Sequence, residues 1–332
     1  EEPCAPFGLI DVQGDGSTVE EAQHVLPDRL SVLLRRQART LGVSVASLFH
    51  LAWAQVVARA TGQASAVFGT VLFGRMQGGT GADRALGLFI NTLPLRVEVD
   101  GAGVVDSVRV VQQRLAALLR HEHAPLSLAQ QCSGVPAPAP LFTSLLNYRH
   151  SVEAKEAGGS GSWEGIQTLS AQERTNYPLT VSVDDWGTGF TLKVQSQRPL
   201  APARIAAFLE KALEGLAEAL VHAPATAVNA VDVLPQDECD QVLRQWNATA
   251  ADYPRQACVH ELFEAQVARD PSAIAVVQGE VWLSYGVLNA RANRLAHHLR
   301  ALGVGADDRV AICLERSVEM VVAGVYSTHL RA

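Results

Sequence analysis

Apolar residues recur at spacings of three and four along several stretches of the chain, a period that predicts amphipathic helices. The first predicted helix follows Pro27 and stops at Gly42, and the second begins after Ser44, whose hydroxyl can cap it. The third has an apolar side that runs from Val104 to Leu119, and the fourth begins near Pro202. On the second helix, the apolar stripe is expected to face the core.

Shorter apolar or alternating runs predict strands at 66–73, 141–149, 178–183 and 190–197. The last two runs are joined by Asp184-Asp185-Trp186-Gly187, which favours a hairpin. Residues 1–26 contain Pro3, Pro6 and a Gly-Asp-Gly-Ser string, so they read as a loop.

The run Leu86 to Arg96, LGLFINTLPLR, predicts a buried strand. Pro94 has no N–H for a strand ladder, which indicates an edge, a bulge or a crossing segment rather than a central strand. Asn91 and Thr92 need hydrogen-bond partners inside an apolar run. They can line a channel, or they can be satisfied polar side chains at a strand end; the pattern alone leaves both interpretations open.

The pattern changes after the fourth helix. Residues 224–232 form a connector, a short helix runs from Leu234-Pro235 to Trp246, and 247–255 is a polar linker. From Cys258 a helix, two strands, a helix through Leu302 and a strand at 309–314 follow one another. Strands that alternate with helices predict an α/β unit with parallel pairing, although it contains too few elements to close a core.

The 332 residues are 48% hydrophobic and 18% charged, which is typical of a globular chain of two domains, or of one domain and a piece of another. The net charge of −7 argues against nucleic acid or an anionic membrane as a partner. Five scattered cysteines without a CxxC pair fit reduced thiols, and no signal peptide or long apolar span is evident, so a cytoplasmic location is expected.

Two apparent motifs do not carry the chemistry they imitate, and one helical histidine has a structural interpretation. The glycine-rich stretch at 74–81 lacks the GK[ST] of a phosphate-binding loop. The string HEHAP at 121–125 has Pro125 where a zinc-binding HExxH motif places its second histidine, so the two-histidine face is absent and no metal site is predicted. His50 is interpreted as a packed or surface histidine.

Five strings together resemble the C-terminal lobe of a condensation domain of the nonribosomal peptide synthetases. They are AVFGTVLFGR (66–75), LGLFINTLPLR (86–96), HEHAPLS (121–127), LFTSLLNYRH (141–150) and ERTNYPLT (173–180). WNATAADYP (246–254) and VHELFEAQ (259–266) resemble the linker into an adenylation domain, and 283–303 resembles the opening motif of that domain. The resemblance ends near Ala323.

The resemblance implies an α/β fold: a chloramphenicol-acetyltransferase-like lobe with a mixed sheet and helices, followed by a partial α/β adenylation subdomain. We expect the lobe at 1–235, a linker at 236–257 and the truncated adenylation part at 258–332. A condensation domain joins two carrier-bound aminoacyl or peptidyl thioesters into an amide, and the second histidine of its HHxxxDG signature acts as the base or positions the amine.

No HHxxxDG occurs in this chain. His297-His298 imitates its start, but Leu302 stands where aspartate is needed, and the string lies in the adenylation-like helix. We therefore expect no catalytic residue here, and an isolated chain that is inactive in condensation. The catalytic motif would belong to an N-terminal lobe, and the chain's ends, EEPCAPFG and GVYSTHLRA, suggest a piece of something longer.

Residue by residue, the resemblance implies candidates for a substrate channel. Gly87, Asn91 and Thr92 would lie in a segment that crosses between the lobes. Asn147 would lie near the catalytic centre from the opposing side. Ordinary strand capping or loop hydrogen bonding is the alternative for each residue.

Arg174 and Asn176 would border the route of the acceptor arm. The partners implied are carrier-protein domains, which bear phosphopantetheine, and the N-terminal lobe; no cofactor is expected on this chain. LLNYRH with NYPLTVSVDD resembles the subtype that epimerises the donor before condensation. The adenylation-like part lacks a glycine-rich phosphate loop, a ribose-binding aspartate and a catalytic lysine, so no nucleotide binding is predicted.

Two other functions stay open. The chain could be a non-catalytic scaffold that docks carrier proteins or a partner lobe, in which case an exposed apolar face is expected. It could instead be a stand-alone acyltransferase, which requires an HxxxD-type histidine; we expect none in the acyltransferase-like part.

Overall fold

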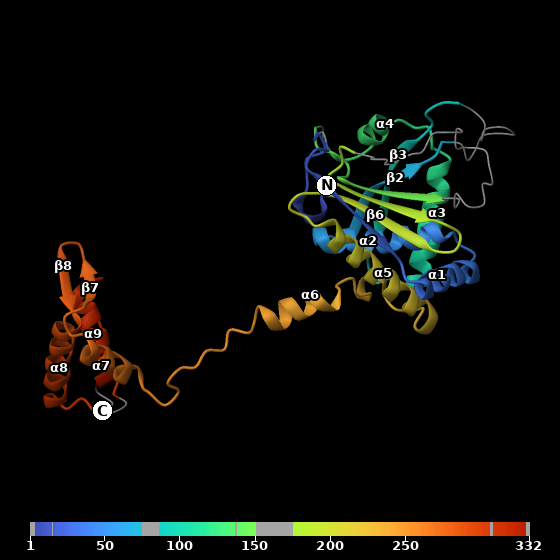
Figure 1. Ribbon diagram of the computed structural model, residues 1–332. Helices are drawn as coiled ribbons and strands as arrows, with labels where there is room; N and C mark the ends of the chain where they lie inside the picture. Colours follow the sequence, from blue (N-terminus) through green and yellow to red (C-terminus); the bar gives the residue numbers. More distant parts are fainter. Residues whose placement is uncertain are drawn as a thin grey trace, which may run out of the picture. The chain divides into compact units, whose positions relative to one another are not determined.

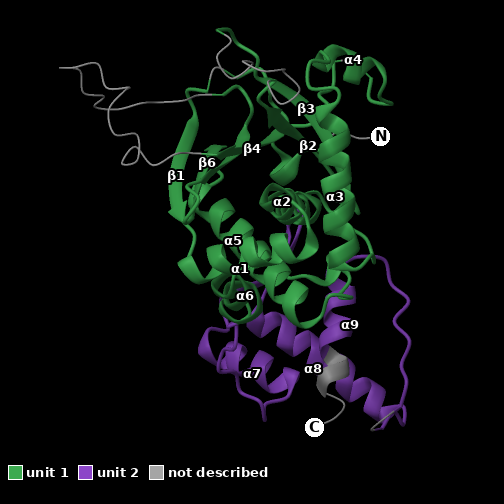
Figure 2. Cartoon of the chain, turned by 90° about the vertical axis from the view of Figure 1, so that its right-hand side faces the viewer, with its two compact units in different colours: residues 1–247 green, residues 248–332 purple. Residues whose placement is uncertain are grey.

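A computed structural model describes residues 4–14, 16–74, 86–136, 138–150, 175–305 and 308–329, the last four of them by backbone alone. The chain forms two compact units, Glu1–Asn247 and Ala248–Ala332. Figure 1 shows the order of the elements, and Figure 2 distinguishes the two units.

The four predicted helices of the first unit are present. They are α1 (Asp28–Leu41), α2 (Val45–Thr61), α3 (Val104–Leu119) and α5 (Pro202–His222). Gly42 ends α1 with a φ of 66°, a left-handed conformation that glycine adopts at little cost. The Ser44 hydroxyl accepts a hydrogen bond from the Ser47 N–H and so caps α2, as predicted.

A mixed sheet of six strands is the framework of this unit. Its strands are β1 (Val19–Val25), β2 (Ser65–Leu72), β3 (Asn91–Glu98), β4 (Ser144–His150), β5 (Leu179–Asp185) and β6 (Phe190–Gln197), in the order β1-β6-β5-β4-β2-β3. The β2–β4 and β4–β5 pairs are parallel and the other pairs are antiparallel. The predicted hairpin is the β5–β6 pair.

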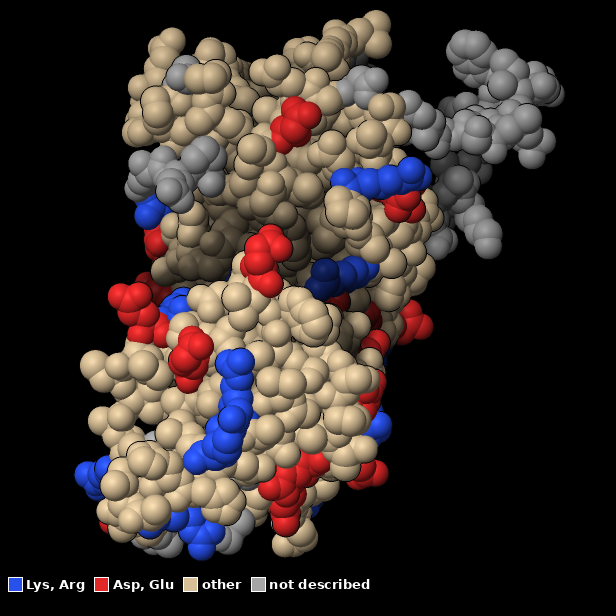
Figure 3. Space-filling view, turned by 90° about the vertical axis from the view of Figure 1, so that its left-hand side faces the viewer, with Lys and Arg blue, Asp and Glu red and all other residues tan. Residues whose placement is uncertain are grey.

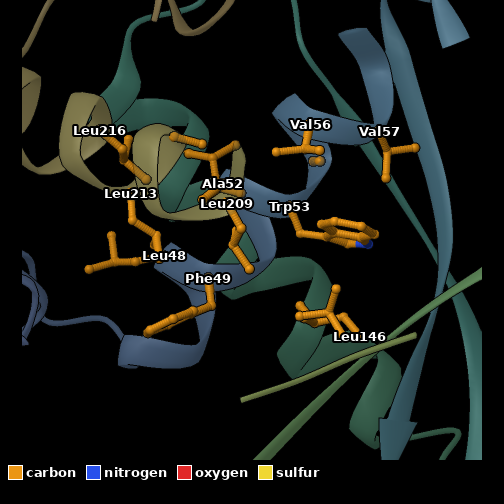
Figure 4. Packing of buried hydrophobic residues seen from close by; sticks show 14 of the residues in the cluster. Leu48, Phe49, Ala52, Trp53, Val56, Val57, Leu146, Leu209, Leu213 and Leu216 are labelled. Carbon is orange, nitrogen blue, oxygen red and sulfur yellow. The ribbon is translucent and has the colours of Figure 1, made fainter. Parts of the chain in front are cut away.

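The core lies between the sheet and the helices. Phe49 and Trp53 of α2 are fully buried, and Figure 4 shows them beside Leu146 of β4 and Leu209 of α5. The prediction of one core-facing stripe on α2 is therefore too narrow, because this helix is covered by both the sheet and α5. A helix that is apolar on all sides is typical of such a central position.

The interpretation of 1–26 as a loop is wrong for β1. Among the described strands, β1 pairs only with β6 and forms one edge of the sheet. Its sequence, VEEAQHV, carries polar side chains at most positions, so the apolar signal that identified the other strands is weak here.

The predicted strand at 86–96 begins only at Asn91. Leu86 and Leu88 are 99% and 89% exposed, whereas Leu93 and Leu95 of β3 are buried. As Pro94 suggested, β3 is the other edge of the sheet. Arg114 of α3 donates to the carbonyl of Arg96, so a side chain occupies part of this free strand edge.

Shorter elements connect these parts. They are η1 (Pro6–Gly8), α4 (Leu126–Gln131), η3 (Val228–Ala230), α6 (Gln236–Asp240) and η4 (Gln241–Gln245). Together α6 and η4 form the helical stretch that was predicted before Trp246.

The second unit contains α7 (Val259–Arg269), β7 (Ile274–Gln278), β8 (Val281–Ser284), α8 (Tyr285–Ala301) and α9 (Val318–His329). The expectation of parallel pairing is wrong, since β7 and β8 form an antiparallel hairpin. The expected strand at 309–314 is also absent from the described structure, and Ile312 and Leu314 are exposed there. A strand requires a neighbour to receive its hydrogen bonds, and no described strand lies beside this run.

No single helix in the described part of the chain is long and apolar enough to cross a membrane. The pair α1 and α2 meets the length and composition criteria only when the two are taken together, and it is bent by 110°.

Candidate substrate-binding face

The six-stranded sheet has one apolar face and one polar face. Leu179, Val181 and Val183 of β5 point into the core, while the intervening Thr180 and Ser182 lie on the opposite face. We call this opposite face the second face: it is the side of the sheet turned away from α1, α2 and α5 (Figure 2). The alternation in the sequence places polar side chains there.

Register aligns these polar side chains into rows that cross several strands. Asn147 of β4 lies opposite Ser182 of β5, and Ser182 lies opposite Lys193 of β6. In the neighbouring row, Thr180 lies opposite Gln195. The second face therefore presents a continuous polar strip across the middle of the sheet.

Two atoms of this strip are buried without a hydrogen-bond partner. They are Oδ1 of Asn147 and Oγ1 of Thr180. Leaving a buried polar atom unpaired costs about 1–3 kcal/mol, so each such atom calls for an explanation, and a ligand or a partner that uses it is one. The strip thus offers an amide oxygen and a hydroxyl on adjacent strands.

Beyond Thr180, the strip ends in a network that is already satisfied. Glu21 of β1 accepts a hydrogen bond of 2.9 Å from Nε2 of Gln195 and pairs with Lys193 at 3.2 Å. Lys193 is therefore held by a carboxylate on the neighbouring strand, and its charge is compensated.

An apolar niche of about 280 Å³ adjoins the second face. Phe142 and Tyr177 stack in it, with ring centroids 5.5 Å apart and planes 12° apart. The residues that line it are Val12, Leu126, Gln130, Pro138, Ala139, Pro140, Leu141, Phe142, Asn176 and Tyr177.

Gly69 of β2 explains how the niche reaches the sheet. A Cβ at this position would overlap the side chains of Leu145, Phe142 and Thr92. Because Leu145 and Thr92 belong to the second face, the Phe142 ring lies over this face as well. The apolar niche and the polar strip are therefore neighbours.

Three of the predicted site residues belong to this region. Thr92, opposite Val71, and Asn147 lie on the second face, and Asn176 lines the niche. Asn176 donates from Nδ2 to the carbonyl of Val12 at 2.7 Å, which fixes its amide.

The other predicted residues are placed differently. Asn91 donates from Nδ2 to the carbonyls of Glu122 and Ala124 at 2.9 and 2.8 Å, and its Oδ1 accepts from the Thr92 N–H, so its amide ties β3 to the turn after α3. Gly87 is exposed, with a φ of 149°. Arg174 lies outside the described residues.

The sequence interpretation missed Thr180, Ser182 and Gln195 as candidates. Their signal was the strict alternation of 179–183 and 190–195, which marks every second side chain as belonging to one face. That signal says which residues share a face, but strand order was needed to show that they meet Asn147.

A charged cluster closes the far end of β4 and β5. Burial by itself raises the pKa of Asp185, but hydrogen bonds from Arg35, Tyr148 and the Gly187 N–H outweigh it, and the pKa lies below its usual value. Burial and the neighbouring Asp185 raise the pKa of Tyr148, which therefore remains a hydrogen-bond donor. This cluster holds the strand ends together.

The described histidines do not form a catalytic pair on the second face. His24 and Asp28 do have HxxxD spacing, contrary to our expectation, but Nε2 of His24 binds Glu210 of α5 at 2.7 Å on the helix side of the sheet. His50 is buried and hydrogen-bonded to Thr70 and to the Ala46 carbonyl, and burial lowers its pKa to about 4.

Potential metal ligands are not clustered in the described regions. No group of three or more His, Cys, Asp or Glu residues there could hold a metal ion. On the side shown in Figure 3, basic and acidic side chains are interspersed.

Comparison with protein families gives two matches. Residues 12–243 match the condensation domain, and residues 263–325 match the AMP-binding enzyme family. The matches follow the chain in the order that the sequence motifs suggested.

The curated relatives are peptide synthetases. The chain is 53% identical to malpinin synthetase of Mortierella alpina over 320 residues, which is 96% of this chain and 4% of that protein. It is 32% identical to bacitracin synthase 3 of Bacillus licheniformis, over 91% of this chain and 5% of that protein. The chain thus spans only a small part of each relative.

Solved structures agree on the fold. The four-domain nonribosomal peptide synthetase AB3403 matches 98% of this chain and 26% of its own length, with a TM-score of 0.75 and 16% identity. The condensation domain of MokA matches 66% of this chain and 50% of its own length, with a TM-score of 0.53 and 23% identity. These neighbours confirm the α/β, chloramphenicol-acetyltransferase-like class. The chain belongs to the condensation-domain family and is part of a nonribosomal peptide synthetase, in which the condensation domain is followed by the beginning of an AMP-binding domain.

Proposed function

We propose that this chain supplies one wall of a condensation site, in which an amide forms between two carrier-bound aminoacyl or peptidyl thioesters. The amine of the acceptor attacks the thioester carbonyl of the donor, and the donor's carrier thiol leaves. The observation that carries this proposal is the pair of buried, unpartnered atoms on the second face, Asn147 Oδ1 and Thr180 Oγ1.

These two atoms suit a thioester-bearing arm. A phosphopantetheine arm contains amide groups that both donate and accept hydrogen bonds, and an extended arm on a sheet face can pair with an amide oxygen and a hydroxyl. The polar strip would supply such partners within a mostly apolar wall, the usual composition of a ligand site. Phosphopantetheine would belong to the carrier domains, and this chain would hold it by these contacts.

The proton-handling histidine would come from a second lobe that bears HHxxxDG. Three large apolar side chains directly before β3 indicate that such a lobe covers this part of the chain. They are Leu86, Leu88 and Ile90, whose exposed fractions are 99%, 89% and 54%. A run of three large exposed apolar side chains is typical of a surface that another protein part covers. This observation also favours the scaffold function, in which the chain docks a partner lobe without catalysing a step itself.

The second unit would play no part in amide formation. We propose the division into a lobe at 1–235, a linker at 236–257 and an adenylation part at 258–332.

The experiment combines this chain, a separately expressed N-terminal lobe with HHxxxDG, and two carrier proteins loaded with aminoacyl groups. Mass spectrometry then measures dipeptide on the acceptor carrier. We expect dipeptide only when both lobes are present, and a loss of about tenfold or more for Asn147→Leu, which removes the amide oxygen.

Lobe binding is measured in the same samples by titration. If the two lobes bind each other but form no dipeptide, the scaffold function is favoured over the condensation site. Dipeptide from this chain alone would contradict the proposed division of roles between the lobes. Leu88→Ser should weaken lobe binding, while Val110→Ser, at an exposed apolar position on α3, serves as a matched control.

A further inference from the structure

The apolar niche beside the second face has the features of a side-chain pocket. It has a volume of about 280 Å³, close to the lower end of ligand pockets at about 300 Å³. None of the described residues that line it carries a charge. A charged group placed there would lose its hydration without gaining a partner, which is costly.

The stacked rings of Phe142 and Tyr177 give the niche a flat apolar surface. Their centroids are 5.5 Å apart, and burial raises the pKa of Tyr177, so its hydroxyl stays neutral. Aromatic and large aliphatic groups pack well against such a surface.

The polar lining residues add mainly hydrogen-bond acceptors. Asn176 donates from Nδ2 to the Val12 carbonyl, and Gln130 donates from Nε2 to the carbonyls of Val135 and Ala139. Gln130 thus uses both of its N–H hydrogens and Asn176 uses one of its two, and both side-chain oxygens remain as acceptors. An N–H group of a ligand would therefore be favoured at the edge of an otherwise apolar pocket.

We propose that the niche binds the apolar side chain of a carrier-bound aminoacyl group, and that Oδ1 of Asn176 accepts a hydrogen bond from the α-amino group of the same residue. The inference rests on the proposed function, since that function is what brings an aminoacyl thioester to the second face. It adds a substrate class: large uncharged side chains are accepted, and acidic ones are rejected.

Binding to the full 332-residue chain tests this assignment without requiring amide formation. The probes are N-acetylcysteamine thioesters of phenylalanine, aspartate and 3-phenylpropionate, titrated to millimolar concentration and followed by ligand-observed NMR. We expect the phenylalanyl probe to bind roughly tenfold or more tightly than the aspartyl probe, because only the former buries apolar surface without desolvating a charge.

Two variants locate the binding. Ala139→Leu fills the niche and should weaken phenylalanyl binding roughly tenfold, whereas Ala203→Leu, at an exposed position on α5, should not change it. Asn176→Ala should reduce binding of the phenylalanyl probe to the level of the 3-phenylpropionyl probe, which has no amine.

Each alternative result overturns the assignment: no binding of any probe, equal binding of the phenylalanyl and aspartyl probes, or phenylalanyl binding that Ala139→Leu leaves unchanged. Amide formation in the two-lobe assay is read separately. If dipeptide forms but the phenylalanyl and aspartyl probes bind equally, only the assignment of the niche is refuted. If the phenylalanyl probe binds selectively but no dipeptide forms, only the proposed function is refuted.

Discussion

The Tyr148 hydroxyl donates a hydrogen bond of 2.6 Å to Oδ2 of Asp185, and so joins the end of β4 to the end of β5. Arg35 of α1 reaches the same carboxylate and lies over the Phe190 ring, with 4.2 Å between the guanidinium carbon and the ring centroid. One buried carboxylate thus ties the helix layer to the sheet that carries the second face.

Asp185→Asn should destabilise the first unit by about 3 kcal/mol, because it leaves the largely covered Arg35 guanidinium, 15% exposed, without its counter-charge. Urea unfolding at neutral pH, followed by near-UV circular dichroism, measures the loss. Tyr148→Phe removes only one donor and should cost about 1 kcal/mol. Equal losses in the two variants would contradict the role given to the ion pair.

Acid should weaken the same cluster. Since the pKa of Asp185 is lowered by folding, its contribution to stability is fully present above the ordinary aspartate pKa of about 4 and is lost as pH falls below that value. Unfolding measured between about pH 3 and pH 6 should show this loss in the natural chain, and a smaller loss in Asp185→Asn. Identical pH dependence would exclude the linkage.

His50 should remain neutral well below neutral pH. Burial lowers its pKa to about 4, so its contribution to stability is present above the unfolded value of about 6.5 and is lost as pH falls towards 4. NMR titration of the buried imidazole should show no protonation above about pH 5, roughly one unit over that pKa. His50→Leu should flatten the stability profile in this window while costing about 1–3 kcal/mol, since the Thr70 hydroxyl loses its partner.

Thr180→Val should stabilise the chain while impairing amide formation. The change keeps the side-chain shape and removes a buried hydroxyl that has no partner, a gain of about 1 kcal/mol. Thr70→Val makes the same chemical change where the hydroxyl binds His50, and it should be destabilising instead. Thermal unfolding distinguishes the two; a destabilised Thr180→Val would show that Thr180 serves the fold rather than a ligand.

Gly69→Ala should disturb the junction of the niche and the strip. A methyl group there would overlap Leu145, Phe142 and Thr92, and overpacking of this kind costs about 1–3 kcal/mol. Gly189→Ala is the control, because nothing lies within 4 Å of a Cβ at that position. Equal melting temperatures for the two variants would contradict the close packing at Gly69.

Much of the fold could be predicted because local patterns specify it. Gly42 and Ser44 bounded α1 and α2 correctly, since a left-handed glycine and a capping hydroxyl act within one turn of the helix. β1 escaped prediction for the opposite reason: its polar sequence is stabilised as a strand by pairing with β6, which lies far away in the chain.

The candidate site shows the same division. The five motifs, read together, identified the family and drew attention to Asn147 and Asn176. The alternation along β5 and β6 already assigned the side chains of these two strands to one face of the sheet or the other. Only the strand order set Thr180 and Ser182 beside Asn147, and only the packing at Gly69 brought Phe142 over the sheet.

Asn91 illustrates the limit most directly. It could be recognised as a polar residue from the sequence, but its engagement with the carbonyls of Glu122 and Ala124 depends on where the chain returns after α3. Periodicity and capping are local properties that the sequence determines by itself, whereas hydrogen-bond partners and cavities depend on residues distant in sequence, which only the tertiary structure brings together.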